Sequence, residues 1–151
     1  MLPDLKPGRP VWIICEDGSE YLERFQRFLD DRFRFVHALD GPALLAALAG
    51  GASGIILDLD FRRTPRERLV DEQGRAGRAL AEDERRRLAS QQGILILRLL
   101  RARGFAPPVL LFADLDDASQ VSYLESTLAP LSIVPSHEGL RQTADRMQAL
   151  G

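Results

Sequence analysis

Acidic residues stand directly after three apolar runs of the sequence. They are Glu16, Asp17, Asp58, Asp60, Asp114, Asp116 and Asp117. Carboxylates brought close together repel one another unless a proton or a cation neutralises them, and hard oxygen ligands in this number suit Mg²⁺. The chemistry indicated first is therefore binding of a divalent cation, with Glu16, Asp17 and Asp58 as candidate ligands and Mg²⁺ as the candidate cofactor.

The organic cations that could balance these acids are almost all arginines. Lys6 is the only lysine of the sequence, and it precedes the first apolar run. Nine arginines and six acids lie between Phe61 and Ser90, together with two glycines and few apolar residues. We interpret this segment as a solvated stretch with internal ion pairs, and the alternative is a docking surface for an acidic partner.

Several of these residues also have a simpler structural interpretation. Asp17 is placed to cap a helix that starts two residues later, and the spacing of Asp117 and Gln120 is typical of a capping box. Asp60 fits a solvated loop. Two histidines lack a carboxylate or cysteine at metal-ligand spacing and are not expected to bind a metal: His37 and His137.

Five short apolar runs, each followed by a segment with helical spacing, are the elements that must position the acids. They predict strands at Val11–Cys15, Arg34–Ala38 and residues 54–57, 108–112 and 132–134. The following helices are expected at residues 19–31, 42–49 and 93–103, and after Asp117 and Leu140. This alternation predicts a doubly wound α/β fold with five βα units around a parallel sheet.

The order of the strands decides whether the acids meet. In an open parallel sheet, sites lie outside the carboxyl ends of the strands, beside the point where strand order reverses. With the flavodoxin-like order 2-1-3-4-5, the first and third strands are neighbours. Glu16, Asp17 and Asp58 would then converge at one edge of the sheet.

Length and spacing predict one domain with an insertion. Residues 1–9 are interpreted as a tail and residues 10–151 as a single domain. The charged segment at about residues 62–90 separates the third strand from the third helix. Its first part, residues 62–77, is expected to be a mobile loop, and residues 80–89 contain good helix formers that could extend the following helix.

Charge and composition argue against binding to nucleic acid or a membrane and against export from the cell. The formal net charge of −2 and the pI near 5.7 provide no field that would attract nucleic acid or an anionic membrane. The single cysteine, Cys15, lies in an apolar run and is interpreted as a buried, reduced thiol, which fits the cytoplasm. No apolar stretch is long enough to span a bilayer, and residues 1–10 do not resemble a signal peptide, so a soluble, non-exported protein is expected.

Five segments together resemble the receiver domains of response regulators in two-component signalling. They are residues 14–19, 55–58, 92–98, 108–113 and 133–135, and they follow one another in the order and spacing of that family. Apart from the insertion, the resemblance extends from about Pro10 to the end of the chain.

The resemblance implies roles for the acids and reveals two departures. In that family, a pair of acidic residues after the first strand binds Mg²⁺, and Glu16 and Asp17 match this pair. The aspartate that ends the third strand accepts a phosphoryl group from a histidine kinase, and Asp58 matches it. A hydroxyl residue ends the fourth strand and a lysine ends the fifth. Phe112 and Val134 stand at those two positions, which indicates a degenerate receiver, or pseudo-receiver.

We therefore expect a non-enzymatic module that acts by protein–protein contact and is not switched by conventional aspartyl phosphorylation. One alternative is a phospho-competent atypical receiver that accepts phosphate on Asp58 with Mg²⁺ and uses an arginine in place of the lysine. A weaker alternative is a phosphohydrolase like the haloacid dehalogenases, with Asp58 as nucleophile and Asp60 as acid/base. Arg62 argues against it, because threonine or valine is expected there.

The resemblance also implies partners and a surface for them. A histidine kinase or an output protein is the expected partner, a homodimer is plausible, and neither nucleic acid nor a membrane is expected. Receivers usually present their fourth helix, fifth strand and fifth helix. The corresponding residues here are Val121, Leu124, Leu128, Leu131, Leu140 and Met147.

Overall fold

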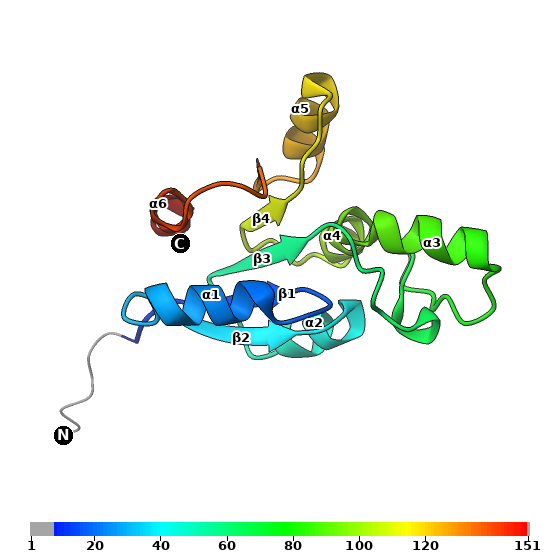
Figure 1. The fold of residues 1–151 in the computed structure, drawn as a ribbon, viewed down its shortest axis with the longest axis horizontal. Helices are drawn as coiled ribbons and strands as arrows, with labels where there is room; N and C mark the ends of the chain where they lie inside the picture. Colours follow the sequence, from blue (N-terminus) through cyan, green and yellow to red (C-terminus); the bar gives the residue numbers. More distant parts are fainter. Residues whose placement is uncertain (1–7, 151) are drawn as a thin grey trace.

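Five parallel strands form a single sheet in the computed structural model, which describes residues 8–150. The strands are β1 (Val11–Cys15), β2 (Arg34–Ala38), β3 (Gly54–Asp58), β4 (Val109–Phe112) and β5 (Leu131–Val134). Their order in the sheet is β2-β1-β3-β4-β5 (Figure 1), which confirms the predicted flavodoxin-like topology. Of the predicted tail, residues 1–7 lie outside the described residues.

Helices cover both faces of the sheet. They are α1 (Glu20–Leu29), α2 (Gly41–Leu48), α3 (Glu82–Ser90), α4 (Gln92–Ala102), α5 (Ala118–Thr127) and α6 (Leu140–Leu150). The apolar residues of α1 and α6 share one core cluster, whereas those of α2, α4 and α5 share the other. Within residues 8–150, no helix is long and apolar enough to cross a membrane.

The continuously apolar strands are explained by these two cores. Successive side chains of a strand point to opposite faces of the sheet. Trp12 and Ile14 therefore pack beneath α1 and α6, while Ile13 and Cys15 pack beneath α2 and α4. Cys15 is free and buried, as predicted, and burial raises the pKa of its thiol.

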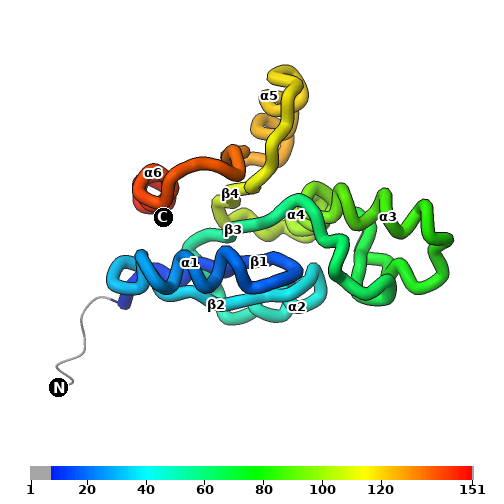
Figure 2. The backbone as a smooth tube through the Cα atoms, viewed as in Figure 1, coloured from blue at the N-terminus to red at the C-terminus, as the bar shows by residue number. Residues whose placement is uncertain are grey.

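The segment between β3 and α4 differs from the mobile loop that was expected over residues 62–77. It contains a 3₁₀ turn at Arg66–Arg68, and Leu69 and Val70 are buried in the domain core. The side-chain amide of Gln92 accepts a hydrogen bond from the backbone N–H of Val70 at 2.9 Å and donates to its carbonyl at 2.8 Å. Burial and paired backbone groups give this segment a defined path, which projects beside α4 (Figure 2).

The second part of the insertion forms a helix of its own. α3 does not continue into α4, because Gln91 between them has φ −114° and ψ 8° and interrupts the helical backbone. α3 then packs against α4, and Ala89 at its end reaches the core. The predicted helix is present, but the predicted extension of the next helix is wrong.

Gly93 fixes the position of α4 behind the end of β3. Its N–H donates to the carbonyl of Leu59 at 2.9 Å. A Cβ at this position would lie 2.2 Å from the carbonyl oxygen of Asp58 and 2.8 Å from the Cα of Leu59. These are backbone atoms, which cannot rotate away, so the contact is possible only for glycine.

We predict that Gly93→Ala destabilises the domain by about 2 kcal/mol or more, because overpacking against backbone forces α4 and β3 apart. Urea unfolding followed by circular dichroism measures the change. Gly50→Ala is the matched control, since its Cβ would meet no atom closer than 3.6 Å. Equal stability of the two variants would contradict this account of the contact.

Candidate functional site

Three residues that the sequence singles out lie side by side at the carboxyl edge of the sheet. Asp58 is in register with Phe112 across β3 and β4, and Phe112 is in register with Val134 across β4 and β5. Phe112 and Val134 are both buried. Phe112 packs on Tyr21, with ring centroids 5.1 Å apart, and on Phe25 at 6.2 Å. The next two positions of the row that starts at Asp58 are thus filled by apolar side chains.

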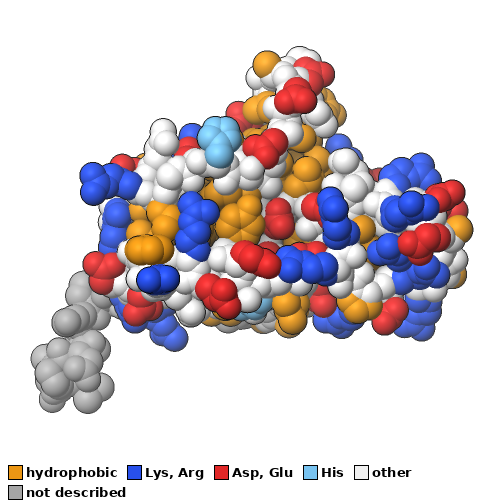
Figure 3. Space-filling view, in the orientation of Figure 1, with side chains coloured by type: hydrophobic (Ala, Val, Ile, Leu, Met, Phe, Trp, Pro, Cys, Tyr) orange, Lys and Arg blue, Asp and Glu red, His pale blue; other side chains and the backbone are white. Residues whose placement is uncertain are grey.

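A surface hollow of about 300 Å³ lies in front of this edge. It is lined by Asp17, Asp58, Asp60, Arg62 and Arg63. The acids end or follow strands β1 and β3, whereas the arginines come from the start of the insertion. Acidic and arginine side chains are interspersed on the side of the molecule seen in Figure 3.

Glu16 lies apart from this hollow and caps α1. Its two carboxylate oxygens accept hydrogen bonds from the backbone N–H groups of Tyr21 at 3.0 Å and Leu22 at 2.9 Å. His37 Nε2 is 3.5 Å from the same carboxylate. Burial raises the pKa of Glu16 despite these donors. The predicted cap was Asp17, so this assignment needs correction: Glu16 reaches the helix end instead.

Asp17 is held by Arg63 through three donors. The backbone N–H of Arg63 donates to Asp17 Oδ2 at 2.9 Å, and its Nε and Nη2 donate to Oδ1 at 3.2 and 2.9 Å. The same guanidinium donates to Glu20 at 2.9 and 3.0 Å, which lowers the pKa of Glu20 to about 2. Sequence reasoning missed Arg63, because nothing distinguishes it from the other arginines of residues 61–90.

Among the three acids of the hollow, Asp58 has the fewest hydrogen-bond donors to stabilise its negative charge in the described chain. Its Oδ1 accepts the N–H of Leu59 at 2.9 Å, and in the described chain no arginine donates a hydrogen bond to it. Burial, followed by the charges of Asp17, Glu16 and Asp60, raises the pKa of Asp58 to about 6. A carboxylate here is therefore poorly stabilised.

Asp60 is in the opposite situation. Arg62 donates to it from its backbone N–H at 2.9 Å and from Nη2 at 2.6 Å. This side-chain hydrogen bond lowers the pKa of Asp60. The expected solvated loop residue is thus tied to a neighbouring arginine.

The structure brings only part of the predicted magnesium site together. Asp17 and Asp58 line the same hollow, but Glu16 faces the end of α1. Within residues 8–150, no group of three or more histidine, cysteine or acidic side chains is arranged to hold a metal ion. Binding of Mg²⁺ by Glu16, Asp17 and Asp58 stays a prediction from the sequence.

Two of the three acids after β4, Asp114 and Asp117, have structural roles. Asp117 caps α5 by accepting from the N–H groups of Ser119 and Gln120 at 2.9 and 3.3 Å, as its spacing indicated. Asp114 accepts hydrogen bonds from the backbone N–H and hydroxyl of Ser136 and so joins the loops after β4 and β5.

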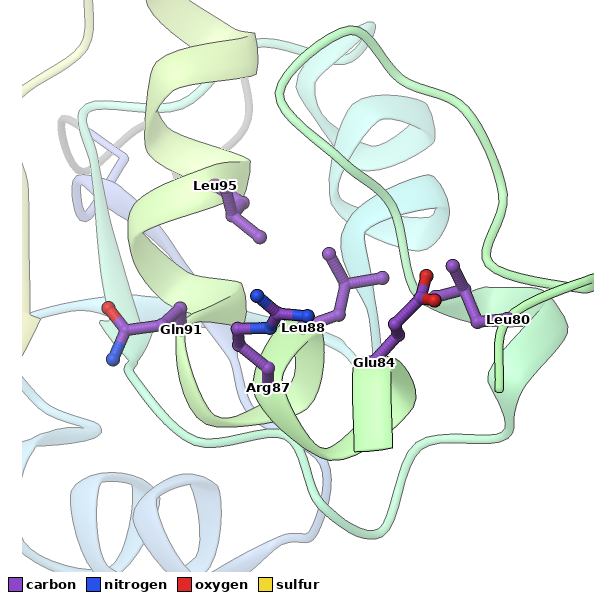
Figure 4. Close-up of a pocket in the computed structure, with 6 residues that line it drawn as sticks. All are labelled: Leu80, Glu84, Arg87, Leu88, Gln91 and Leu95. Atoms are coloured by element: carbon purple, nitrogen blue, oxygen red, sulfur yellow. The ribbon is translucent and has the colours of Figure 1, made fainter. Parts of the chain in front are cut away.

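A second hollow, of about 340 Å³, lies between α3 and α4. Its lining, drawn in Figure 4, is Leu80, Glu84, Arg87, Leu88, Gln91 and Leu95. It contains none of the acids of the sheet edge. Its leucines form an apolar floor, and the two charged side chains belong to α3.

Half of the predicted interaction face belongs to the core. Leu124, Leu128 and Met147 are buried inside the domain, because they form the apolar stripes by which α5 and α6 pack on the sheet. The other predicted residues, Val121, Leu131 and Leu140, are partly buried. The most exposed large apolar residue of these elements is Tyr123 of α5, with 61% of its surface accessible.

Comparison with known proteins finds similarity in the fold of the backbone and none in the sequence-based searches. No protein-family model matches the sequence, and no protein of curated function matches it. Among solved structures, the receiver domain of the Francisella response regulator 1452 superposes with a TM-score of 0.62 at 16% identity, over 94% of this chain and 96% of that chain.

Two further structures agree with this result. Chemotaxis protein CheY4 of Vibrio cholerae gives a TM-score of 0.64 at 11% identity, over 95% of this chain and 100% of that chain. The receiver domain of a signal transduction histidine kinase from Syntrophus aciditrophicus gives 0.64 at 16% identity, over 93% and 89%. The chain therefore has the fold of response-regulator receiver domains, with an extra helix after β3.

Proposed function

We propose that this domain is a receiver-like signalling module that acts by protein–protein contact and is not switched by conventional aspartyl phosphorylation. The observation that carries the proposal is the row of Asp58, Phe112 and Val134 at the edge of the sheet. In receiver domains, the hydroxyl residue and the lysine at the other two positions of this row donate to the phosphoryl oxygens, and the phosphorylated state is sensed through these contacts. Phenylalanine and valine side chains have no donor.

Electrostatics supports the same proposal. An acyl phosphate on Asp58 would place about two negative charges where a single carboxylate is already disfavoured. A pKa of about 6 for Asp58 reflects that cost. A modification shifts a conformational equilibrium only through contacts that differ between the two states. The buried side chains of Phe112 and Val134 provide no such polar contact.

The phospho-competent receiver is kept as a second candidate because Arg62 and Arg63 line the hollow in front of Asp58. Arginine binds phosphate well. Both guanidiniums are engaged by other carboxylates, Arg62 by Asp60 and Arg63 by Asp17 and Glu20. An incoming phosphate would have to compete with these pairs, so we rank this candidate second.

We further propose that the domain is not an enzyme. The phosphohydrolase alternative needs Asp60 to donate a proton, whereas its ion pair with Arg62 lowers its pKa and favours the charged form. The proposed place of action is the cytoplasm, and the proposed partner is a histidine kinase, an output protein or a second copy of the chain. The surface proposed for it is the exposed side of α5, around Tyr123.

We predict that Asp58→Asn stabilises the domain at pH 8 by about 2 kcal/mol, allowing for solvent screening of a partly buried group. The folded-state pKa of Asp58, about 6, lies above its ordinary value of 3.8, so the folded protein holds this proton more tightly than the unfolded chain. The penalty for ionisation therefore grows from about pH 4 to about pH 6 and is constant above that range.

Urea unfolding at pH 8 and pH 4.5 measures this effect, and the advantage of Asp58→Asn should shrink at the lower pH. Asp60→Asn is the control, because Arg62 lowers the pKa of Asp60 and removal of its charge should not stabilise the domain. Stabilisation of similar size by both substitutions would show that general acidic repulsion, and not burial of Asp58, is responsible.

We predict that incubation with acetyl phosphate and Mg²⁺ produces no adduct on Asp58, as measured by intact mass against Asp58→Asn. The double variant Phe112→Ser with Val134→Lys restores a hydroxyl and a cation and should gain an adduct. A melting curve establishes that this variant is folded. A stable aspartyl phosphate on the natural sequence, with a changed assembly state, would favour the phospho-competent receiver.

We predict that Tyr123→Glu weakens capture of the signalling partner by at least about tenfold, because aromatic residues dominate contact energies. The immobilised domain is offered to an extract of its source cells, and bound signalling proteins are quantified by mass spectrometry. Phe28→Glu on α1 is the matched control, since Phe28 is 60% exposed and Tyr123 is 61% exposed. Loss of capture by Phe28→Glu alone would move the partner surface to α1.

A further inference from the structure

The oxygens of the acidic edge are already engaged by donors from the protein itself. Both oxygens of Glu16 accept N–H groups of α1, both oxygens of Asp17 accept donors of Arg63, and one oxygen of Asp58 accepts the N–H of Leu59. Mg²⁺ demands near-octahedral oxygen coordination at short range. These residues, as they lie, do not fit the metal that the receiver fold implies.

Arg63 makes the kind of contact with Asp17 that a bound cation would make. It approaches both carboxylate oxygens, one through its backbone N–H and the other through Nε and Nη2. Only 4% of the Asp17 side chain is accessible to solvent. A carboxylate so removed from water requires a partner charge, and a guanidinium offers several donors in a fixed geometry.

We propose that Arg63 is the resident cation of the acidic edge, a tethered guanidinium that takes the place of a divalent metal at Asp17. The insertion after β3 thereby supplies the positive charge of the site. Asp17 is then neutralised without a metal ion.

The surroundings of Arg63 are shaped to receive it. A Cβ at Gly18 would lie 2.3 Å from Oε1 of Glu20 and 2.4 and 2.7 Å from Nη2 and Nη1 of Arg63, so the absence of a side chain at Gly18 leaves room for the guanidinium and its partner. Beyond it, Glu20 accepts from both Nη1 and Nη2. Residues 17, 18 and 20 thus form one binding site for a single arginine.

The neighbouring arginine provides a contrast. Arg62 pairs with Asp60, only two residues away, and its side chain is 80% exposed. Among residues 8–150, it makes no ion pair or hydrogen bond to a distant part of the chain. Arg63, by contrast, connects the insertion to the loop between β1 and α1 across 46 residues of sequence. Two adjacent arginines of equal charge therefore have different roles, and they form a matched pair for experiment.

A magnesium titration of variants of the 151-residue chain tests the proposal. Arg63→Gln removes the charge and should increase the affinity for Mg²⁺ by at least about tenfold over the natural sequence, because the acids Asp17 and Asp58 then lack a cation. The amide resonances of Leu59 and Gly18 should shift with added MgCl₂. Arg62→Gln removes an equal charge from the same hollow without touching Asp17, so it should gain clearly less affinity than Arg63→Gln. All titrations are matched in ionic strength with NaCl.

Gly18→Ala is the second variant, and it keeps every charge while its Cβ disturbs both the guanidinium of Arg63 and the carboxylate of Glu20. It should show intermediate affinity for Mg²⁺, and it carries the test if Arg63→Gln fails to fold. The proposal is overturned if the natural sequence binds Mg²⁺ as tightly as Arg63→Gln, or if neither Arg63→Gln nor Gly18→Ala gains affinity. These outcomes concern the cation at Asp17 and leave the proposed role of Phe112 and Val134 to the acyl-phosphate experiment.

Discussion

Neutralisation of carboxylates at the ends of parallel strands is the constraint on which the rest of this domain depends. The topology delivers acids to one edge of the sheet, and each needs a separate partner. Backbone amides of α1 stabilise Glu16, and two neighbouring arginines stabilise Asp17 and Asp60. Among the described residues, Asp58 accepts a hydrogen bond from one backbone N–H, that of Leu59. Its pKa is raised, because burial and the neighbouring acids disfavour its charged form. Among the three acids of the hollow, Asp58 is thus the one without an arginine partner in residues 8–150, and it is the position where phosphorylation would add charge.

The arginine-rich insertion takes part in neutralising these carboxylates. Arg63 ties it to the loop after β1, and Arg68 donates two hydrogen bonds of 2.9 Å to Asp40 in the loop after β2. Asp40 in turn caps α2. Ion pairs at exposed sites contribute little individually, but a charge held at a buried carboxylate matters more. The inserted segment therefore helps to organise two loops of the sheet edge.

Sequence reasoning succeeded where spacing along the chain determines position in space. The strand order, and with it the row of Asp58, Phe112 and Val134, follows from five apolar runs with helices between them. It could not identify Arg63, because side-chain contacts across 46 residues leave no local signal. It also placed Leu124 on a partner surface, although an apolar stripe on a helix marks the side that packs on the core. Two apolar residues in a polar stretch, 69 and 70, were the neglected sign of an ordered insertion.

The hydrogen bonds between Gln92 and Val70 determine where the insertion tolerates added or deleted residues. The side-chain amide of Gln92 pairs with both the N–H and the carbonyl of Val70, as a neighbouring strand would do in a sheet. The chain near residue 70 is therefore anchored in the interior. The turn over residues 71–79 is mostly exposed, with Gly77 its one buried residue. Insertions, deletions and proteolytic cuts are therefore compatible with the fold in that turn. Excision of the whole segment would instead remove Leu69, Val70 and Ala89 and open the core beneath α4.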